Sequence, residues 1–178
     1  MIQTLINVLG IVGILASIVG FQTRKHQQLM VCRTTNEIAF GIQYILLGAY
    51  AGAAMNFIGC LRNILFSRLV KKNRSTIPLR ITFSLLFCAF AYLTRDGIKS
   101  ALIALAKVIS TVAYGTANLF FARVTILVSS TIWLIYNLFV RSYAGAFNEV
   151  MTIASIIIGI LRIDIPNLKR KGNENIEI

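Results

Sequence analysis

The sequence Tyr50-Ala51-Gly52-Ala53 returns 93 residues further along the chain as Tyr143-Ala144-Gly145-Ala146. Working outward from this motif, residues 14–69 align with residues 107–162 without a gap, and ten of the 56 aligned pairs are identical. A repeat of this length normally means that one supersecondary unit occurs twice. In a membrane protein it indicates a transporter built from two related helix bundles.

Composition places this chain in a membrane. Of its 178 residues, 57% are hydrophobic and 13% are charged, and the mean hydropathy is +0.75. A soluble domain of this size has too little interior to bury so many apolar side chains, whereas a helix that crosses hydrocarbon needs about 20 apolar residues in succession. Seven spans are predicted, at 3–21, 30–48, 51–70, 77–94, 99–116, 119–140 and 144–163.

The repeat and the number of spans together predict the fold class. Each repeat has three crossings, so one additional crossing is needed between them if both are to have the same orientation. We therefore expect an all-α membrane protein with two parallel three-helix bundles and a linker helix. The predicted divisions are a first repeat at 1–72, the linker helix at 73–97, a second repeat at 98–163 and a cytoplasmic tail at 164–178.

The net charge of +12 is explained by topology. With the N-terminus outside, only Arg95, Lys99 and Arg141 lie at outer ends or loops. Thirteen basic residues lie at cytoplasmic ends or loops: Arg24, Lys25, Arg33, Arg68, Lys71, Lys72, Arg74, Arg80, Arg123, Arg162, Lys169, Arg170 and Lys171. This asymmetry follows the positive-inside rule and predicts a bacterial inner-membrane protein with its C-terminus in the cytoplasm. Anionic lipid headgroups are the expected partners of the basic loops, and nucleic-acid binding is not expected.

Other motifs argue against a processed or enzymatic protein. No basic segment precedes the first apolar run, so no cleaved signal peptide is expected. Cys32, Cys60 and Cys88 lack a metal-binding spacing and are expected to be buried apolar fillers without disulfides. His26 lies in a basic loop and is expected at the surface. The sequence shows no nucleophile–base set, paired carboxylates or phosphate-binding loop, so we expect neither an enzyme nor a metal or cofactor site.

Two polar stripes lie at equivalent positions of the repeats. The first comprises Asn36, Glu37, Gln43 and Tyr44 around Phe40, and the second comprises Ser129, Ser130, Tyr136 and Asn137 around Trp133. Helical spacing places each set on one face, and polar groups that face lipid are costly. Both faces therefore point inward. They either line a solute path or join helices by hydrogen bonds, and the matched pair of stripes favours the path.

The third and seventh spans carry further polar groups. Asn148, Thr152 and Ser155 share one face of the seventh span, and Asn56 lies close to the position equivalent to Asn148. Arg62 lies within the third span, where an unpaired arginine costs about 2.5–3.5 kcal/mol. An ion pair, an anionic solute or a reach to the cytoplasmic surface would each account for it, and pairing or reaching out is favoured.

Intramembrane charges also suggest pairs. Lys107 and Glu149 are predicted to form a structural salt bridge, with a proton-coupling pair as the alternative. Glu37 has a candidate partner in Arg33, four residues earlier on the same helix. Stripes of small residues on spans one and three, including Gly13 and Gly59, indicate close helix packing. Packing within the bundle is expected, and a homo-oligomer is the alternative.

Specific motifs resemble known families. The segment Trp133-x-x-Tyr136, followed fifteen residues later by Asn148, is similar to SWEET sugar transporters, which have parallel repeats. The stretch from Leu47 to Tyr50 with Ile58, Arg62 and Ile64 resembles the bacterial inner-membrane YgjV-like family, as do 133–137, Glu149 and 160–162. That family is distantly related to the SWEET and PQ-loop proteins. The Pro-Gln pair is absent, and Pro78 and Pro166 lie outside spans one, two, five and six, where the SWEET resemblance implies proline hinges.

Two functions follow from these observations. The first is a SWEET-like transporter of a small polar solute through a site between the bundles. The candidate binding residues are Asn36, Gln43, Tyr44, Asn56, Arg62, Trp133, Tyr136, Asn137 and Asn148. Aromatic and amide groups suit a hydroxylated solute, whereas Arg62 favours an anion, and the sequence leaves both open. The second function is a non-transporting membrane scaffold or assembly protein that keeps the fold.

Overall fold

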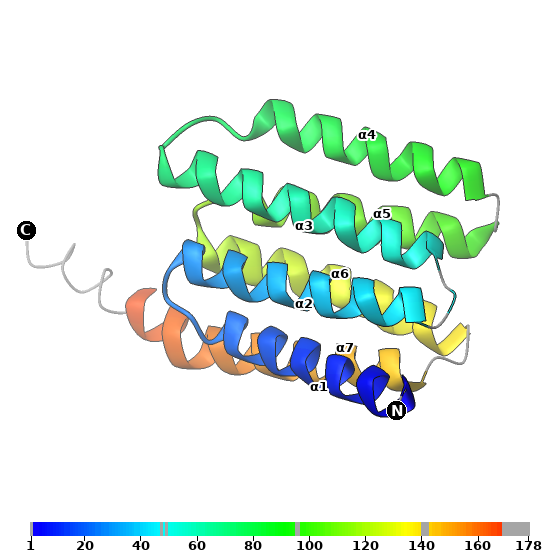
Figure 1. Ribbon diagram of the computed structural model, residues 1–178. Coiled ribbons are helices and arrows are strands. Elements are labelled where there is room, and N and C mark those ends of the chain that lie inside the picture. Colours follow the sequence, from blue (N-terminus) through cyan, green and yellow to red (C-terminus); the bar gives the residue numbers. More distant parts are fainter. Residues whose placement is uncertain (1, 47, 49, 95–96, 140–142, 169–178) are drawn as a thin grey trace, which may run out of the picture.

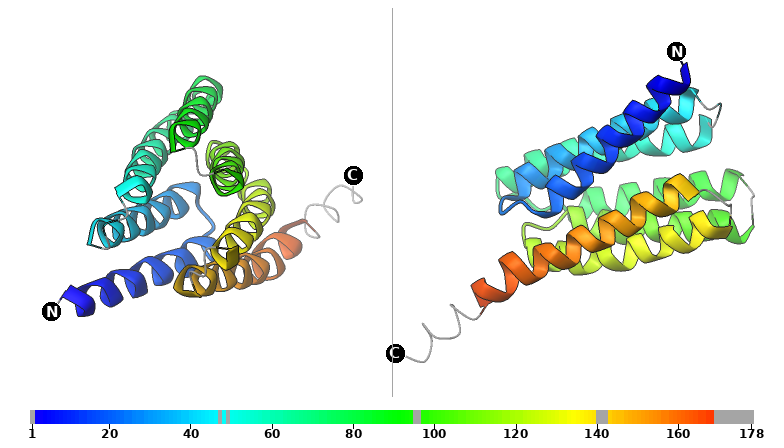
Figure 2. Two further views of the ribbon diagram at one scale, coloured as in Figure 1. Left: turned by 90° about the vertical axis from the view of Figure 1, so that its right-hand side faces the viewer. Right: turned by 90° about the horizontal axis from the view of Figure 1, so that it is seen from below.

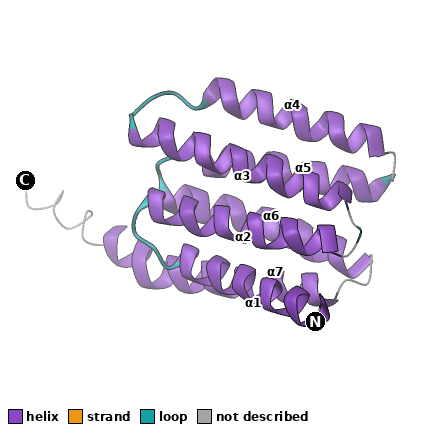
Figure 3. Cartoon of the chain, viewed as in Figure 1, coloured by secondary structure: helices purple, strands orange, loops and turns teal. Residues whose placement is uncertain are grey.

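The structure is a computed structural model that describes residues 2–46, 48, 50–94, 97–139 and 143–168. Helices form all the regular structure of these residues, and no strand occurs among them (Figure 3). The predicted all-α class is therefore confirmed. Leu47, Ala49, Arg95, Arg141 and the tail residues 169–178, for which the sequence made predictions, lie outside the described residues.

Seven α-helices in the described part of the chain correspond to the seven predicted spans. They are α1 (Ile2–Phe21), α2 (His26–Leu46), α3 (Tyr50–Lys71), α4 (Ile77–Thr94), α5 (Ile98–Tyr114), α6 (Leu119–Phe139) and α7 (Tyr143–Gly159), and a short π-helix, η1 (Ile160–Asp164), continues α7. Most helix ends lie within two residues of the prediction. α2 begins four residues early, because polar residues that hydropathy does not register, His26 to Gln28, extend it.

The helices lie side by side, and successive helices run in opposite directions (Figure 1). Seen end on, they follow one another around the molecule, with α1, α2 and α3 on one side and α5, α6 and α7 on the other (Figure 2). α2 packs between α1 and α3, α6 packs between α5 and α7, and α4 packs mainly against α5. Contacts of α1 with α7 and of α3 with α5 join the two sides.

The start of α1 and the end of η1 lie at opposite ends of the helices (Figure 1). We call the end at which α1 begins the N-terminal end, and the opposite end, toward which η1 extends, the C-terminal end. α1, α3, α5 and α7 all run from the N-terminal end to the C-terminal end. An odd number of antiparallel helices produces this arrangement.

Within the described part of the chain, three segments are long and apolar enough to cross a membrane: Ile2–Phe21, Leu119–Phe139 and Gly145–Leu168. Shorter apolar helices cover Ile77–Leu93 and Ser100–Tyr114. The outer face of α1 exposes Leu5, Val8, Ile11, Leu15 and Val19. Such a continuous apolar surface is unfavourable in water and suits contact with acyl chains.

An apolar cluster closes the C-terminal end of the bundle. Its buried members are Phe21, Leu29, Met30, Phe66, Ala113, Tyr114, Ile126 and Ile156. They come from the last part of α1, α3, α5 and α7 and from the first part of α2 and α6, which all lie toward that end. We call this set the apolar plug. A second cluster, Met55, Phe83 and Phe87, packs between α3, α4 and α5.

Candidate functional site

A cavity of about 80 Å³ lies between the two sides of the bundle, mainly in its N-terminal half. Six of the nine predicted binding residues line it: Asn36, Tyr44, Asn56, Trp133, Asn137 and Asn148. Both members of the predicted ion pair, Lys107 and Glu149, also line it, whereas Gln43, Arg62 and Tyr136 do not. Residues far apart in the sequence therefore meet here, and both repeats contribute to the wall.

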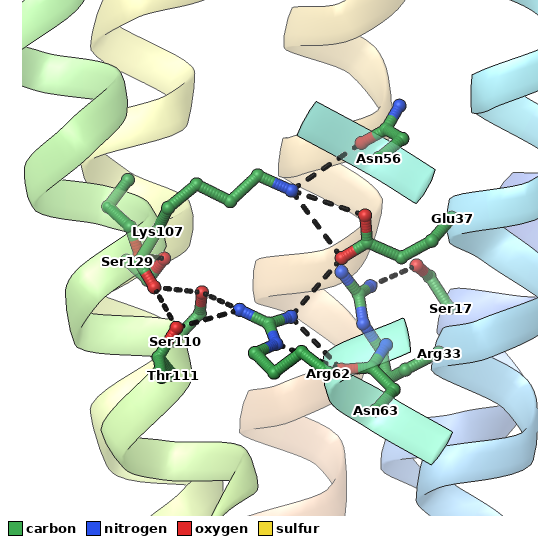
Figure 4. Close-up of polar contacts among 11 residues, drawn as sticks. Ser17, Arg33, Glu37, Asn56, Arg62, Asn63, Lys107, Ser110, Thr111 and Ser129 are labelled. Carbon is green, nitrogen blue, oxygen red and sulfur yellow. Dashed lines mark hydrogen bonds and ion pairs between the residues drawn. The ribbon is translucent and has the colours of Figure 1, made fainter. Parts of the chain in front are cut away.

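Glu37 is the centre of a buried ionic network beside this cavity (Figure 4). Its carboxylate accepts from Arg62 Nη2 at 3.3 Å through Oε1 and from Lys107 Nζ at 3.2 Å through Oε2. The side chain is only 3% exposed. α2 thus supplies one anion to cations from α3 and α5, and the network joins the two sides of the molecule.

Gly59 makes the position of Glu37 possible. A Cβ atom added to Gly59 would lie 2.5 Å from Glu37 Oε2. The absence of a side chain on α3 at this point therefore gives the carboxylate its space. The predicted role of the glycines in packing within the bundle is confirmed here and at Gly13, whose added Cβ would lie 2.7 Å from the Phe40 ring.

Arg62 is fully buried and has polar partners all around its guanidinium. Nη1 donates to Ser110 Oγ at 3.2 Å and to Thr111 Oγ1 at 3.0 Å, and Nη2 donates to Asn63 Oδ1 at 3.0 Å. Its Cζ atom lies 5.0 Å from the centre of the Tyr114 ring, within range of a cation–π interaction. Of the explanations offered by the sequence, the ion pair is the one observed, and Arg62 does not reach the cytoplasmic surface.

Lys107 has a different partner from the one predicted. Its ammonium pairs with Glu37 and donates to Asn56 Oδ1 at 3.5 Å, rather than pairing with Glu149. Glu149 instead accepts from Asn148 Nδ2 at 3.1 Å. The prediction rested on the depth of each residue in its own helix, which does not determine which helices face each other. The Lys107 ammonium also lies 5.9 Å from the Trp133 ring centre.

Arg33 likewise does not form its predicted pair with Glu37. Nη1 donates to Ser17 Oγ on α1 at 2.8 Å, and the guanidinium lies 5.8 Å and 5.5 Å from the ring centres of Phe21 and Tyr114. The Nε atom is buried without a hydrogen-bond partner. An i,i+4 spacing permits a contact on one helix, but the stronger tertiary partners of Glu37 prevail. Arg33 nevertheless lines the cavity.

Several predicted binding residues also hold helices together. Asn36 Nδ2 donates to Gly13 O at 2.8 Å, and Gln43 Nε2 donates to Ile6 O at 2.9 Å, so both connect α2 to α1. Trp133 and Tyr136 form an edge-to-face pair with ring centres 5.5 Å apart. Gln43 is therefore an interhelical link rather than part of the cavity wall. Asn36 has both roles, because it donates a hydrogen bond to α1 and also lines the cavity.

Sequence reasoning missed part of the wall. Arg33, Phe40, Tyr114 and Ile126 line the cavity and were not candidates. The polar stripes do not include Tyr114, and the charge pattern places Arg33 at the cytoplasmic end. The sequence does contain a pattern that could have predicted Arg33 as a wall residue, because Arg33 lies one helical turn before Asn36 and Glu37 on the same polar stripe.

A second buried ion pair fastens the C-terminal end. Arg123 Nη1 contacts Asp164 Oδ1 and Oδ2 at 2.7 and 2.8 Å, and its Nε donates to Phe21 O at 3.0 Å. Another nitrogen of the same guanidinium donates to Thr23 O. Arg123 thus joins the end of α1, the start of α6 and η1 below the apolar plug.

His26 and the cysteines differ from the predictions. His26 is buried, and its Nε2 lies 2.9 Å from Tyr114 O, which places it at the end of α5 rather than at the surface. His26 is the first residue of α2 rather than part of a loop, and the start of this helix packs against the end of α5, which composition does not reveal. Cys32 and Cys60 are partly buried and Cys88 is exposed, so they are not buried fillers, although all three are free thiols. The described residues hold no cluster of three or more His, Cys, Asp or Glu side chains that would suit a metal ion.

The chemistry of the cavity is that of recognition. Its wall offers amide and hydroxyl groups, aromatic faces, two cations and two carboxylates. Such a wall can hold a polar solute by hydrogen bonds and charge, and it provides apolar ring surface on one side.

Comparison with known proteins gives one family. The family model Imp-YgjV, described as a bacterial inner membrane protein, matches residues 4–165. No significant match occurs among curated proteins or among solved structures. The resemblance to the YgjV-like family that the motifs suggested is therefore confirmed over nearly the whole chain.

Proposed function

Because the chain belongs to the Imp-YgjV family of bacterial inner membrane proteins, we propose that it transports a small polar solute across that membrane. The solute passes through the cavity between α1–α3 and α5–α7. The single observation that supports this most strongly is the one-sided character of the interior. A polar, charged cavity occupies the N-terminal half, and the apolar plug closes the C-terminal half.

The proposed architecture is the SWEET-like arrangement of three, one and three helices. The repeats correspond to α1–α3 and α5–α7, and α4 is the linker. α1 and α5 run in the same direction, as parallel repeats require (Figure 1). If the repeats are equivalent, α1 corresponds to α5 and α7 corresponds to α3. The contact of α1 with α7 then corresponds to the contact of α5 with α3, and both contacts occur. A two-fold relation along the membrane normal accounts for this pair of contacts.

This architecture suits alternating access. The cavity wall takes Asn36, Glu37 and Asn56 from the first repeat and Lys107 and Trp133 from the second. Rocking of one repeat against the other would part the apolar plug while the N-terminal ends of the repeats approach each other, so that the cavity opens to one side at a time. Arg123 also links the two repeats at the C-terminal end, because it donates to Phe21 O and Thr23 O at the end of α1. Release of these two hydrogen bonds is the step that would open the C-terminal end.

The scaffold alternative also has an observation in its favour. Ligand pockets usually enclose about 300–1,000 Å³, and this cavity has about 80 Å³. A protein that only needs a rigid polar centre would have such a closely packed interior. A transporter in a closed conformation would have it too, so binding and uptake decide between the two functions.

The test is uptake into proteoliposomes that contain the purified protein. A panel of sugars, amino acids, organic anions and organic cations is offered, and saturable uptake of at least one class is expected. Trp133→Ala and Asn148→Ala remove wall groups and should lower this uptake by about tenfold or more, the loss associated with one good polar or aromatic contact. Phe147→Ala, at an exposed position beside Asn148 in sequence, is the matched control.

The outcomes separate the two functions. Uptake that falls in both wall variants and persists in Phe147→Ala supports transport. If no solute is taken up and none raises the thermal midpoint of the purified protein, the transport proposal is wrong and the scaffold function stands.

We also infer that the C-terminal end faces the cytoplasm. The described basic residues at this end are Arg24, Lys25, Arg68, Lys71, Lys72, Arg74, Arg80, Arg123 and Arg162. Loops rich in lysine and arginine are retained on the cytoplasmic side of the membrane. The exposed residues among these nine would contact anionic lipid headgroups there.

A further inference from the structure

The charges around the cavity do not balance. Among the described residues, the cavity and the network beside it contain three cations, Arg33, Arg62 and Lys107, and two carboxylates, Glu37 and Glu149. One formal positive charge is therefore in excess. A buried charge is costly unless an opposite charge compensates it, so the wall favours an anion over a cation.

The excess charge is shared by Arg33, which interacts electrostatically with Glu149, and by the Glu37 network, in which one carboxylate faces two cations. Both oxygens of Glu37 are occupied by Arg62 and Lys107. Arg62 does not line the cavity and is surrounded by protein acceptors. Arg33 does line the cavity, donates a hydrogen bond to the neutral hydroxyl of Ser17, and has a buried Nε atom without a hydrogen-bond partner. Figure 4 shows the side chains of Arg33, Arg62 and Lys107 converging on the same region around Glu37.

Lys107 is bound only loosely by the groups around it. Its contacts to Glu37 Oε1 and Oε2 and to Asn56 Oδ1 measure 3.5, 3.2 and 3.5 Å, longer than the about 2.7–2.9 Å of a strong charge-assisted hydrogen bond. Its ammonium also lies near the face of Trp133, which lines the cavity. An anion in the cavity would therefore find one cation, Arg33, with a donor that has no partner, and a second, Lys107, whose three donors make only long contacts.

We propose that the cavity binds a small organic carboxylate, with the carboxylate group on the side lined by Arg33 and Lys107. The inference rests on the proposed function and names its substrate class. Size limits the rest of the molecule, since an apolar cavity of about 150 Å³ holds benzene and this one has about 80 Å³. This volume limits the candidates to the smallest organic anions, such as acetate and propionate, and the Trp133 ring is part of the same wall.

Trp133 provides the measurement, because it is the single tryptophan of the chain and lines the cavity. The full-length protein in detergent is titrated with acetate and propionate, with the neutral acetamide and propionamide, with ethylammonium and with chloride. Tryptophan fluorescence and the thermal midpoint are recorded in each titration. We expect saturable changes with the two carboxylates and none with the matched amides or the cation.

Variants then test the two cations. Arg33→Gln and Lys107→Gln should each weaken carboxylate binding by about tenfold or more, the range for one hydrogen-bonded charge. Lys72→Gln, which removes an exposed charge near the end of α3, is the control and should bind as the parent protein does. If Lys107→Gln does not fold, Arg33→Gln alone decides, because Arg33 lies outside the Glu37 salt bridges.

Each outcome has a distinct meaning. Saturable binding of amides or of ethylammonium, unchanged in Arg33→Gln, overturns the carboxylate assignment but leaves transport standing. Chloride that saturates the site and excludes acetate identifies an inorganic anion and also overturns it. Absence of binding and of uptake for every class removes the proposed function itself. Uptake of labelled propionate into proteoliposomes, lost in Arg33→Gln, supports both.

Discussion

Glu37 is the residue on which the centre of the molecule depends. It is the acceptor for two buried cations that belong to different repeats. Removing a partner from a buried ion pair leaves an uncompensated charge, which is more costly than never having formed the pair. The loss of Glu37, which leaves two cations uncompensated, should therefore lower the free energy of unfolding more than the loss of Lys107, after which Glu37 still pairs with Arg62.

Glu37→Gln leaves Arg62 and Lys107 without their anion. We expect the free energy of unfolding to fall by about 3–5 kcal/mol, measured as a lower thermal midpoint and a lower denaturation midpoint in detergent. Lys107→Met should cost less, because Glu37 keeps Arg62. The double variant Glu37→Gln, Lys107→Met should be less destabilised than the sum of the single variants, since the two changes act on one contact. Additive effects would show that the 3.2 Å contact carries no coupling energy.

Gly59→Ala tests the packing of the same carboxylate. The new Cβ would lie 2.5 Å from Glu37 Oε2 and 2.7 Å from its Cδ, so the carboxylate must move away from its cations. We expect a loss of about 1–3 kcal/mol, typical of overpacking, and a shift in Trp133 fluorescence as Lys107 is released.

Gly10→Ala is the control for that change. Its Cβ would meet the flexible end of Gln43 at 3.1 Å, which can move aside. Equal effects of the two substitutions would mean that helix contact in general, rather than the position of Glu37, explains the loss.

At the residue scale, the sequence predicts inward faces better than it predicts partners. The stripes around Phe40 and Trp133 do face the interior, because helical spacing alone determines which residues share a face. Glu37 was assigned to Arg33 and Lys107 to Glu149, and both assignments are wrong. Which cation reaches which carboxylate depends on the rotation and the depth of several helices relative to one another, and no local pattern contains that information.

At the scale of elements, apolar runs predict the helices with little error. Hydrocarbon demands a helix of nearly fixed length, so the ends of an apolar run lie close to the ends of a helix. The exceptions occur where polar groups find protein partners. α2 extends to His26 because His26 and Gln27 contact Tyr114 O and Ser67 O, and α7 continues into η1, where Asp164 pairs with Arg123.

The Arg123–Asp164 pair is the testable feature of these elements. Arg123→Gln removes the charge opposite a buried Asp164 and weakens the bonds to the carbonyls of Phe21 and Thr23. We expect a loss of about 3–5 kcal/mol for this single change. The C-terminal end should also open, seen as faster labelling of Cys32 by a small maleimide.

Two further variants complete that experiment. Arg123→Leu combined with Asp164→Leu removes both buried charges and should recover part of the stability, because no charge is left unpaired. Arg162→Gln changes an exposed cation of η1 and should leave both stability and labelling unchanged. If Arg123→Gln behaves like Arg162→Gln, the pair does not hold the C-terminal end together.

At the scale of the whole molecule, the repeat at a constant offset was the most informative part of the sequence. It predicts that α1–α3 correspond to α5–α7, and contacts of α1 with α7 and of α3 with α5 both occur. The cavity lies where the proposed arrangement would bring the inward faces of the two repeats together. Its size does not follow, because side chains such as Arg62 and Phe40 fill space that the pattern of polar residues leaves undefined.

Orientation in the membrane is the last prediction, and it tests the arrangement as a whole. In a variant without Cys32, Cys60 and Cys88, single cysteines are placed at Gln3 and Ser75, which are exposed at the N-terminal and C-terminal ends respectively. Because the basic loops are retained in the cytoplasm, Gln3→Cys should react with a membrane-impermeant maleimide in intact cells, and Ser75→Cys only after permeabilisation.

The opposite pattern would contradict the charge argument alone, since parallel repeats tolerate either orientation. Reaction of both positions from one side would contradict more, because α1, α2 and α3 would then cross the membrane an even number of times. The second repeat would no longer enter from the same side as the first, and the cavity would not be formed by two like-facing triplets.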